Sequence, residues 1–137
     1  MNKIHSSGIN CENSNALTPP ARHYSHVCTA AGQVFVSGQL PIDAKGTPLT
    51  GKPFDVQARQ VLANLEACLE VAGTSKERLV QVRVYVTDIL DWPVFNALYA
   101  EWIGPHCPAR AVAGVSELHF GLAVEVEAIA LAAGQVN

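Results

Sequence analysis

The stretch VQVRVYVT, residues 80–87, decides the fold class of this 137-residue chain. Apolar valines alternate with other residues, so that Val80, Val82, Val84 and Val86 face one way and Gln81, Arg83, Tyr85 and Thr87 the other. Because successive side chains point to opposite faces of a strand, this pattern predicts a β-strand with one dry face. A second strand is predicted at residues 122–132, with Val124, Val126, Ala128 and Ala130 on one face and Glu125, Glu127, Ile129 and Leu131 on the other.

Two amphipathic helices accompany these strands. Apolar residues recur at steps of three and four between residues 54 and 72, which predicts a helix of about five turns; they are Ala58, Val61, Leu62, Leu65, Cys68, Leu69 and Ala72. Gly73 follows in the position that commonly ends a helix. A second helix is predicted from Asp91, a suitable N-cap with Pro93 in the first turn, to Gly104. Its apolar positions are Val94, Leu98 and Trp102 with Phe95, Tyr99 and Ile103.

The rest of the chain supplies three strands, a loop and an N-terminal segment. Residues 24–31 and 33–40 predict a hairpin around Gly32, and residues 110–115 predict a short strand. Residues 41–51 predict a loop, and residues 1–20, which are polar and end in Thr-Pro-Pro, predict an extended lead-in segment. The order ββ-α-β-α-ββ predicts one α+β domain over residues 1–137, with two helices covering one face of a mixed sheet.

Composition and charge narrow the class of protein. Hydrophobic residues make up 49% of the chain, and charged residues make up 15%, against about 25% charged residues in an average domain. The surplus of apolar residues suggests a subunit that hides part of its surface in an oligomer. The net charge of −3 and the scattered basic residues argue against a nucleic-acid partner. No apolar run approaches the length that spans a bilayer, and the N-terminus has no signal-peptide core. We therefore expect a cytoplasmic protein with no membrane partner.

The second face of the predicted sheet mixes apolar and charged side chains. Tyr85, Ile129 and Leu131 lie there among charged residues, namely Arg83, Glu125 and Glu127. A second subunit on this face would bury both kinds, and buried charges must be paired or solvated in a cavity. The pattern predicts a small polar site between subunits.

Arg110 and Glu125 are the two candidates for chemistry. Arg110 opens a run that is otherwise apolar, and its planar fork suits a substrate carboxylate, although it could instead pair with Glu125 or Glu127 across the sheet. Glu125 could be a general acid or base if its pKa is raised, or a structural partner of Arg83 or Arg110. Glu127, two residues along the same face, is the internal control.

Other kinds of site are not indicated. Ser37-Gly38 lacks the pattern of a nucleophile elbow, and it is more typical of a strand end where glycine lets another backbone approach. Four widely spaced cysteines, Cys11, Cys28, Cys68 and Cys107, match no zinc spacing. The histidines form no metal-binding pair, and no glycine-rich phosphate loop is present. We expect neither a metal nor a cofactor.

Five segments, in this order and spacing, resemble the RidA/YjgF family of reactive-intermediate (enamine/imine) deaminases: VFVSGQLPID, QARQVLANLEACLEVAG, VYVTDILDWPVFNALYAEW, PAR and VEVEAIA. The resemblance covers about residues 22–132. It implies a chorismate-mutase-like subunit assembled as a homotrimer, with three clefts between adjacent subunits. It also implies that Arg110 binds the substrate carboxylate, that Glu125 lies at the hydrolytic water, and that Tyr24, Ser37, Gly38 and Asn96 line the pocket.

The implied reaction is cofactor-free hydrolysis of 2-imino or 2-enamino acids to 2-keto acids and ammonia. The alternative is a trimer that binds a small metabolite or a protein without turnover, and release of ammonia or keto acid would separate the two. This chain departs from the family pattern at Arg22-His23, at Ala111-Val112 in place of Ser-Cys, and at His119-Phe120 in place of Pro-Lys. The Ala-Val pair predicts a drier pocket that favours a bulkier imine.

Overall fold

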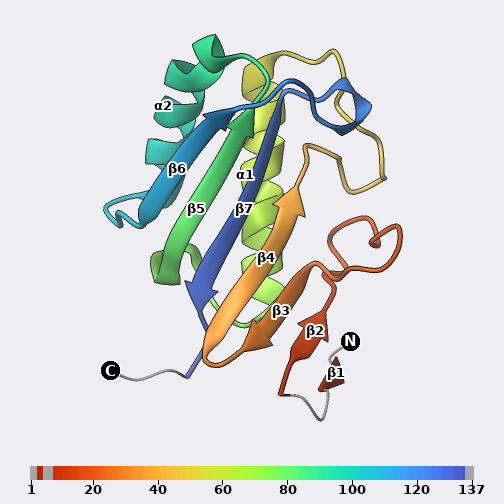
Figure 1. The fold of residues 1–137 in the computed structure, drawn as a ribbon, viewed down its shortest axis with the longest axis vertical. Coiled ribbons are helices and arrows are strands. Elements are labelled where there is room, and N and C mark those ends of the chain that lie inside the picture. The colour runs from red at the N-terminus through yellow and green to blue at the C-terminus, as the bar shows by residue number, and fades with distance from the viewer. Residues whose placement is uncertain (1–2, 5–7, 135–137) are drawn as a thin grey trace.

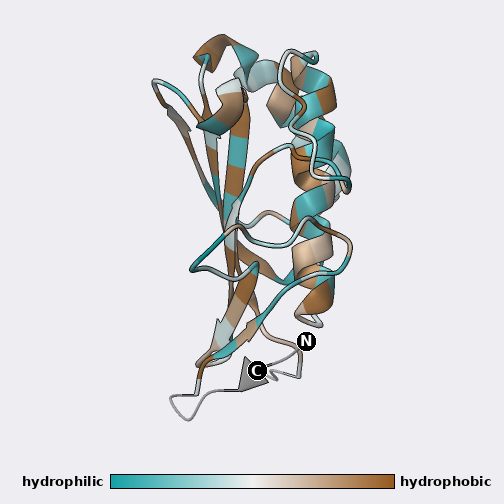
Figure 2. Ribbon diagram, turned by 90° about the vertical axis from the view of Figure 1, so that its right-hand side faces the viewer, coloured by the Kyte–Doolittle hydropathy of each residue, from teal (hydrophilic) through white to brown (hydrophobic). Residues whose placement is uncertain are grey.

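The computed structural model describes residues 3–4 and 8–134 of the chain, folded as a seven-stranded sheet with both helices on one side (Figures 1 and 2). The strands are β1 (Lys3–Ile4), β2 (Asn10–Glu12), β3 (Val27–Ala30), β4 (Gln33–Gln39), β5 (Leu79–Val86), β6 (Ala109–Gly114) and β7 (Val124–Leu131). Their order in the sheet is β1-β2-β3-β4-β7-β5-β6, and only the β5–β6 pair is parallel. The predicted α+β architecture with two helices on one face is confirmed.

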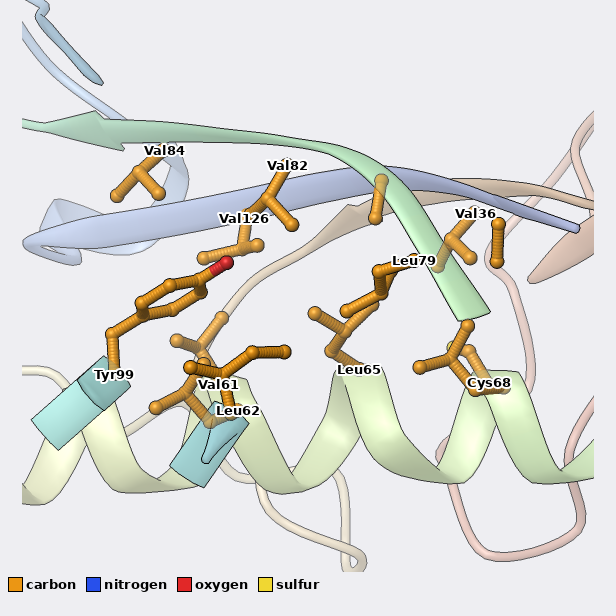
Figure 3. Close-up of a cluster of buried hydrophobic side chains, with 14 of the residues drawn as sticks. Val36, Val61, Leu62, Leu65, Cys68, Leu79, Val82, Val84, Tyr99 and Val126 are labelled. Atoms are coloured by element: carbon orange, nitrogen blue, oxygen red, sulfur yellow. The ribbon is translucent and has the colours of Figure 1, made fainter. Parts of the chain in front are cut away.

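The core lies between the sheet and helix α1 (Phe54–Val71) (Figure 3). The predicted helix stripe is buried from Ala58 to Leu69, whereas Ala72 is only partly buried at the C-cap; Gly73, with φ +78°, follows it. On the sheet side, the buried positions of β7 are Val124, Val126, Ala128 and Ala130, as the alternation predicts. Among the described residues, no helix combines the length and hydropathy needed to cross a membrane.

One residue of the deciding stretch faces the opposite way from its prediction. The pairing of β5 with β7 shifts register between Leu79 and Gln81, so Leu79 is buried and Val80 is 45% exposed. A bulge of this kind inserts one residue and reverses the facing of side chains before it. The prediction for Val80 is therefore wrong, whereas Val82, Val84 and Val86 are buried as expected.

Turns and helix ends follow local sequence chemistry. The β3–β4 hairpin turns at Ala31 and Gly32, which both have positive φ, as a two-residue type I′ turn requires. Helix α2 (Trp92–Ile103) begins after Asp91 and ends at Gly104, as predicted. Asp91 occupies the N-cap position, but its side chain makes no cap hydrogen bond, and Val94, one of the apolar positions of the helix, is 44% exposed.

The lead-in segment is more structured than its polar sequence predicts, because β2 joins the sheet by pairing with β3. His26 anchors the residues that follow β2. Its Nδ1 accepts a hydrogen bond from the Ser14 N–H at 3.0 Å, and its Nε2 lies 3.0 Å from the Thr18 carbonyl oxygen. The backbone N–H of His26 also donates to the Asn13 side chain at 2.9 Å. Nδ1 accepts and Nε2 donates in this arrangement, so the ring is neutral.

This anchoring predicts that acid loosens the lead-in segment. Burial lowers the pKa of His26 from 6.5, and the hydrogen bond to Thr18 opposes that shift in part. The unfolded chain therefore binds more protons than the native chain just below pH 6.5, so stability falls as the pH falls from that value. Thermal unfolding between pH 7.5 and pH 5 should show a decline in Tm that is smaller in His26→Gln.

His23 provides the control for this measurement, because its side chain is exposed. His23→Asn keeps a residue type that tolerates the positive φ at this position. It should follow the wild-type pH dependence. An equal decline of Tm with falling pH in His26→Gln and in the wild type would contradict the role assigned to His26.

Candidate functional site

The sheet face turned away from the helices, which we call the open face, carries the charged residues of β5 and β7. The Tyr85 hydroxyl donates to Glu127 Oε1, and Arg83 Nη1 lies 3.6 Å from Glu127 Oε2. Glu127 is thus engaged by two partners from the neighbouring strand. The half-apolar, half-charged face predicted from the alternation is confirmed, and Arg83 pairs with Glu127 rather than with Glu125.

Glu125, by contrast, is half-buried and has no hydrogen bond or ion pair within the described part of the chain. Burial raises the pKa of its carboxyl above the ordinary value of 4.5; His119 opposes this rise and Glu127 adds to it. Within the described residues of one chain, Glu125 is therefore not an ion-pair partner of Arg83 or Arg110. A carboxyl with a raised pKa can take and return a proton nearer neutral pH, which is what general acid–base chemistry needs.

Gly38 leaves the space that the Glu125 carboxylate occupies. The β4–β7 pairing shifts register between Val36 and Gln39, and a Cβ added to Gly38 would overlap Glu125 Oε2. The glycine therefore permits close approach of a side chain, not of another backbone as the strand-end interpretation expected. The neighbouring Ser37 donates its hydroxyl to the Ser25 carbonyl at 2.6 Å, so it anchors the strand in this chain.

Two adjacent hollows open beside Glu125, and they share His119 and Phe120. The first, of about 560 Å³, is lined by Glu125 and residues 117–121. The second, of about 600 Å³, contains Tyr24 and Gly38 among mostly apolar residues from the lead-in segment and the loop after β4. Phe120 has a positive φ of 61°, and its carbonyl accepts from Thr50 Oγ1 at 2.7 Å. Phe120 is 62% exposed and lines both hollows.

Arg110 lies on the edge strand β6 and is held by α2. Its guanidinium carbon lies 4.7 Å from the centre of the Trp92 ring and 4.9 Å from that of Tyr99. Its Nη1 donates to Asn96 Oδ1 at 3.1 Å. Stacking and one hydrogen bond fix the plane of the group, so the fork is set before a ligand arrives. Within the described residues of one chain, Arg110 therefore makes no ion pair with Glu125 or Glu127.

Trp92 and Tyr99 were missed as site residues from the sequence. The signal was present, because Trp92, Asn96 and Tyr99 are spaced by four and three residues and share one helix face. For His119 the sequence shows only a departure from the family pattern. Its nearness to Glu125 depends on the tertiary structure.

In one chain, the two candidate groups lie on opposite faces of the sheet. Arg110 is paired with Val82 of β5, which is buried under the helices, so the Arg110 side chain lies on the helix side. Glu125 is paired with Tyr85 of β5, and both side chains lie on the open face. Val82 and Tyr85 are three residues apart, which is about 10 Å along the strand. The structure thus brings Tyr24, Gly38 and Glu125 together at one place, and it brings Asn96 and Arg110 together at another.

Residues 111 and 112 also face different ways. Ala111 is level with Arg83 and lies exposed on the open face. Val112 is level with Val84 and packs against the core. Val112 thus shares the helix side of β6 with Arg110, whereas Ala111 lies on the same face as Glu125. Among residues 3–4 and 8–134, no three His, Cys, Asp or Glu side chains are grouped to hold a metal ion.

Comparison with known proteins gives consistent relatives. Residues 14–132 match the family described as endoribonuclease L-PSP. A RutC family protein of Pyrococcus horikoshii is 40% identical over 111 residues, which cover 81% of this chain and 88% of that protein. A 2-iminobutanoate/2-iminopropanoate deaminase of Dermatophagoides farinae is 29% identical over 85% of this chain and 91% of its own length.

Solved structures agree with this result. RidA from an Antarctic Psychrobacter species superposes with a TM-score of 0.82 at 32% identity, covering 88% of this chain and 97% of that one. TdcF of E. coli with bound serine gives a TM-score of 0.82 at 26% identity, with the same coverage. The fold, the matched residues and these relatives lead to one conclusion: the chain belongs to the RidA/YjgF family.

Proposed function

We propose that this protein hydrolyses 2-imino or 2-enamino acids to 2-keto acids and ammonia, at sites formed between copies of the chain. The observation that carries the proposal is the Glu125 carboxyl, which is half-buried, unpaired within the described residues and open to a hollow. Support also comes from the Dermatophagoides farinae relative, whose name is that of an imine deaminase.

Arg110 is the proposed carboxylate-binding group. Its guanidinium uses one hydrogen bond to Asn96 and two aromatic faces for its placement. A guanidinium has five N–H donors, so donors remain for both oxygens of a substrate carboxylate. The bound serine of TdcF is a small 2-amino acid with the same carboxylate. We extend that ligand chemistry to this chain as part of the proposal.

Glu125 is the proposed acid–base group. The substrate reacts as the protonated imine, and the carboxylate takes a proton from a water molecule as the water oxygen attacks the carbon of the C=N bond, which gives a neutral carbinolamine. The protonated carboxyl then gives this proton to the amine nitrogen. The hydroxyl group returns its own proton to the carboxylate as the C=O forms and the C–N bond breaks, so 2-keto acid and ammonia leave, and ammonia finally takes up the remaining proton. A raised pKa suits both halves of this exchange, because the group must accept and donate within one cycle.

The site needs a second copy of the chain because Arg110 and Glu125 lie on opposite faces. The open face also presents apolar side chains, including Phe35, which is 42% exposed beside Ile129. A neighbouring copy seated there would cover these residues and bring its own Arg110 to Glu125. We propose the closed ring of three copies that the family resemblance implies, since three identical head-to-tail contacts close such a ring.

We assign the apolar hollow beside Gly38 to the side chain of the substrate. Leu17, Leu40 and Phe120 are among its lining residues, and its polar Asn64 already donates to two backbone carbonyls. Each further buried methylene of a ligand contributes about 0.8 kcal/mol. We therefore propose that longer aliphatic or aromatic imines are preferred over the imine of alanine.

The rival function is binding without turnover. The same Arg110 cradle could hold a carboxylate ligand without any role for Glu125. Cleavage of RNA, which the description of the matching family names, is not favoured by a net charge of −3. Release of ammonia from a freshly generated imine distinguishes hydrolysis from binding without turnover.

The central test compares two neighbouring glutamates. Imines generated in place from alanine, leucine and phenylalanine should be hydrolysed by the wild type, and Glu125→Gln should lower kcat by about 10²–10⁴-fold because it removes only the proton acceptor. Ammonia release in a coupled assay measures the rate.

Glu127→Gln is the matched control, because Glu127 lies on the same face but is held by Arg83 and Tyr85. It should keep most of the activity while the assembly stays intact. Normal turnover by Glu125→Gln would leave the binding function as the better account.

Gly38→Ala tests the placement of the carboxylate. The added methyl must displace the Glu125 side chain, which is flexible, while Gly38 has no positive φ that would strain an alanine. We expect kcat to fall by about 10-fold or more, because misplaced catalytic groups are costly, while Tm changes little. Kinetics and thermal unfolding of the same sample provide the readout. A variant with unchanged kcat would show that the close approach has no role in catalysis.

A further inference from the structure

Two thiols lie against each other on the open sheet face, several strands away from Arg110. Cys11 in β2 and Cys28 in β3 are directly opposite each other in the antiparallel pairing, and their Sγ atoms are 3.1 Å apart. In the single chain both side chains are partly exposed, toward the edge of the sheet that lies farthest from β6. Figure 1 shows these two strands side by side near one edge of the sheet, and neither thiol has a place in the proposed hydrolysis.

The backbone already has the spacing that a disulfide requires. Directly opposite residues of an antiparallel pair have Cα atoms about 4.5–5.5 Å apart, which lies inside the range found for disulfides. The sulfur atoms must approach from 3.1 Å to about 2.05 Å, which needs rotation of side chains but no new strand pairing. The other two cysteines differ, because Cys68 is buried in the core and Cys107 is exposed elsewhere.

We propose that Cys11 and Cys28 are an oxidative modification site, at which a hydroperoxide joins them in a disulfide within one chain. Sulfur of the first thiol attacks the O–O bond of hydrogen peroxide, which gives a sulfenic acid and one water. Sulfur of the second thiol then attacks the sulfenic sulfur, and a second water leaves. The sum is two thiols and one peroxide giving one disulfide and two waters, so the peroxide is the oxidant throughout.

The surroundings of the pair make its oxidation slow. Burial, together with the contact to Cys11, raises the pKa of Cys28 to about 11. A thiol reacts with peroxide far more slowly than a thiolate. The site therefore responds to excess peroxide rather than to traces of it.

The bond would close a loop that contains the second half of the lead-in segment. Residues 12–27 lie between the two cysteines, and they include Tyr24 and the anchor His26. Because a disulfide restricts the unfolded chain, the oxidised protein should be more stable. The same loop supplies Leu17 and Pro19 to the hollow beside Gly38, so oxidation would also fix one wall of that hollow.

The test uses full-length Cys107→Ser protein, which lacks the exposed thiol that could link two chains. Hydrogen peroxide at a few-fold excess should lower the mass by about 2 Da, and peptide mapping should find residues 11 and 28 joined. Alkylation after denaturation should then label Cys68 alone. Tm should rise by about 5–10 °C and return to its starting value with dithiothreitol.

Matched variants decide the outcome. Cys11→Ser and Cys28→Ser, each in the Cys107→Ser background, should gain oxygen or stay unchanged in mass and should show no rise in Tm. A linked peptide that includes Cys68, a cross-link between two chains, or the absence of any linked peptide would overturn the proposal. These results do not depend on the hydrolase activity, so failure of either proposal is visible separately.

Discussion

The two-faced alternation of β7 is the constraint on which the rest of the structure depends. Its valines and alanines, at positions 124, 126, 128 and 130, are buried against the helices, so its glutamates are forced onto the opposite face. β7 lies between β4 and β5, and both neighbours add to the environment of these glutamates. Glu127 meets Tyr85 and Arg83 from β5, whereas Glu125 meets Gly38 from β4 and keeps a free carboxyl. Two residues of one type, two positions apart, therefore have different capacities for chemistry.

The same alternation links catalysis to assembly. Arg110 is on the helix side of the edge strand β6, where Trp92, Asn96 and Tyr99 hold it, and Glu125 is on the open side. The hydrolysis that we propose uses both groups and therefore requires two chains to meet. In this account, the apolar residues of the open face have a purpose beyond stability, because covering them completes the site. Substrate would then contact a carboxylate from one chain and a guanidinium from another.

Regular patterns made much of the fold predictable. The valine alternation, the helix stripe before Gly73 and the hairpin at Gly32 follow from local residue spacing, and each is found in the structure. Val80 could not be placed because the bulge arises from pairing with β7, and β2 was missed because its polar residues gain their strand geometry from β3. For the site, spacing pointed to Glu125 and Arg110. The freedom of Glu125, the aromatic cradle of Arg110 and the nearness of His119 depend on contacts between distant segments.

Mixed assemblies test the claim that each site is shared between two chains. Arg110→Lys and Glu125→Gln should each be nearly inactive alone, and co-expression in equal amounts should form some sites that combine an intact Arg110 with an intact Glu125. In a ring of identical contacts, random mixing restores both groups at roughly one contact in four, so about a quarter of wild-type ammonia release is predicted. Mixed rings of normal mass with no more activity than the separate variants would contradict the shared site.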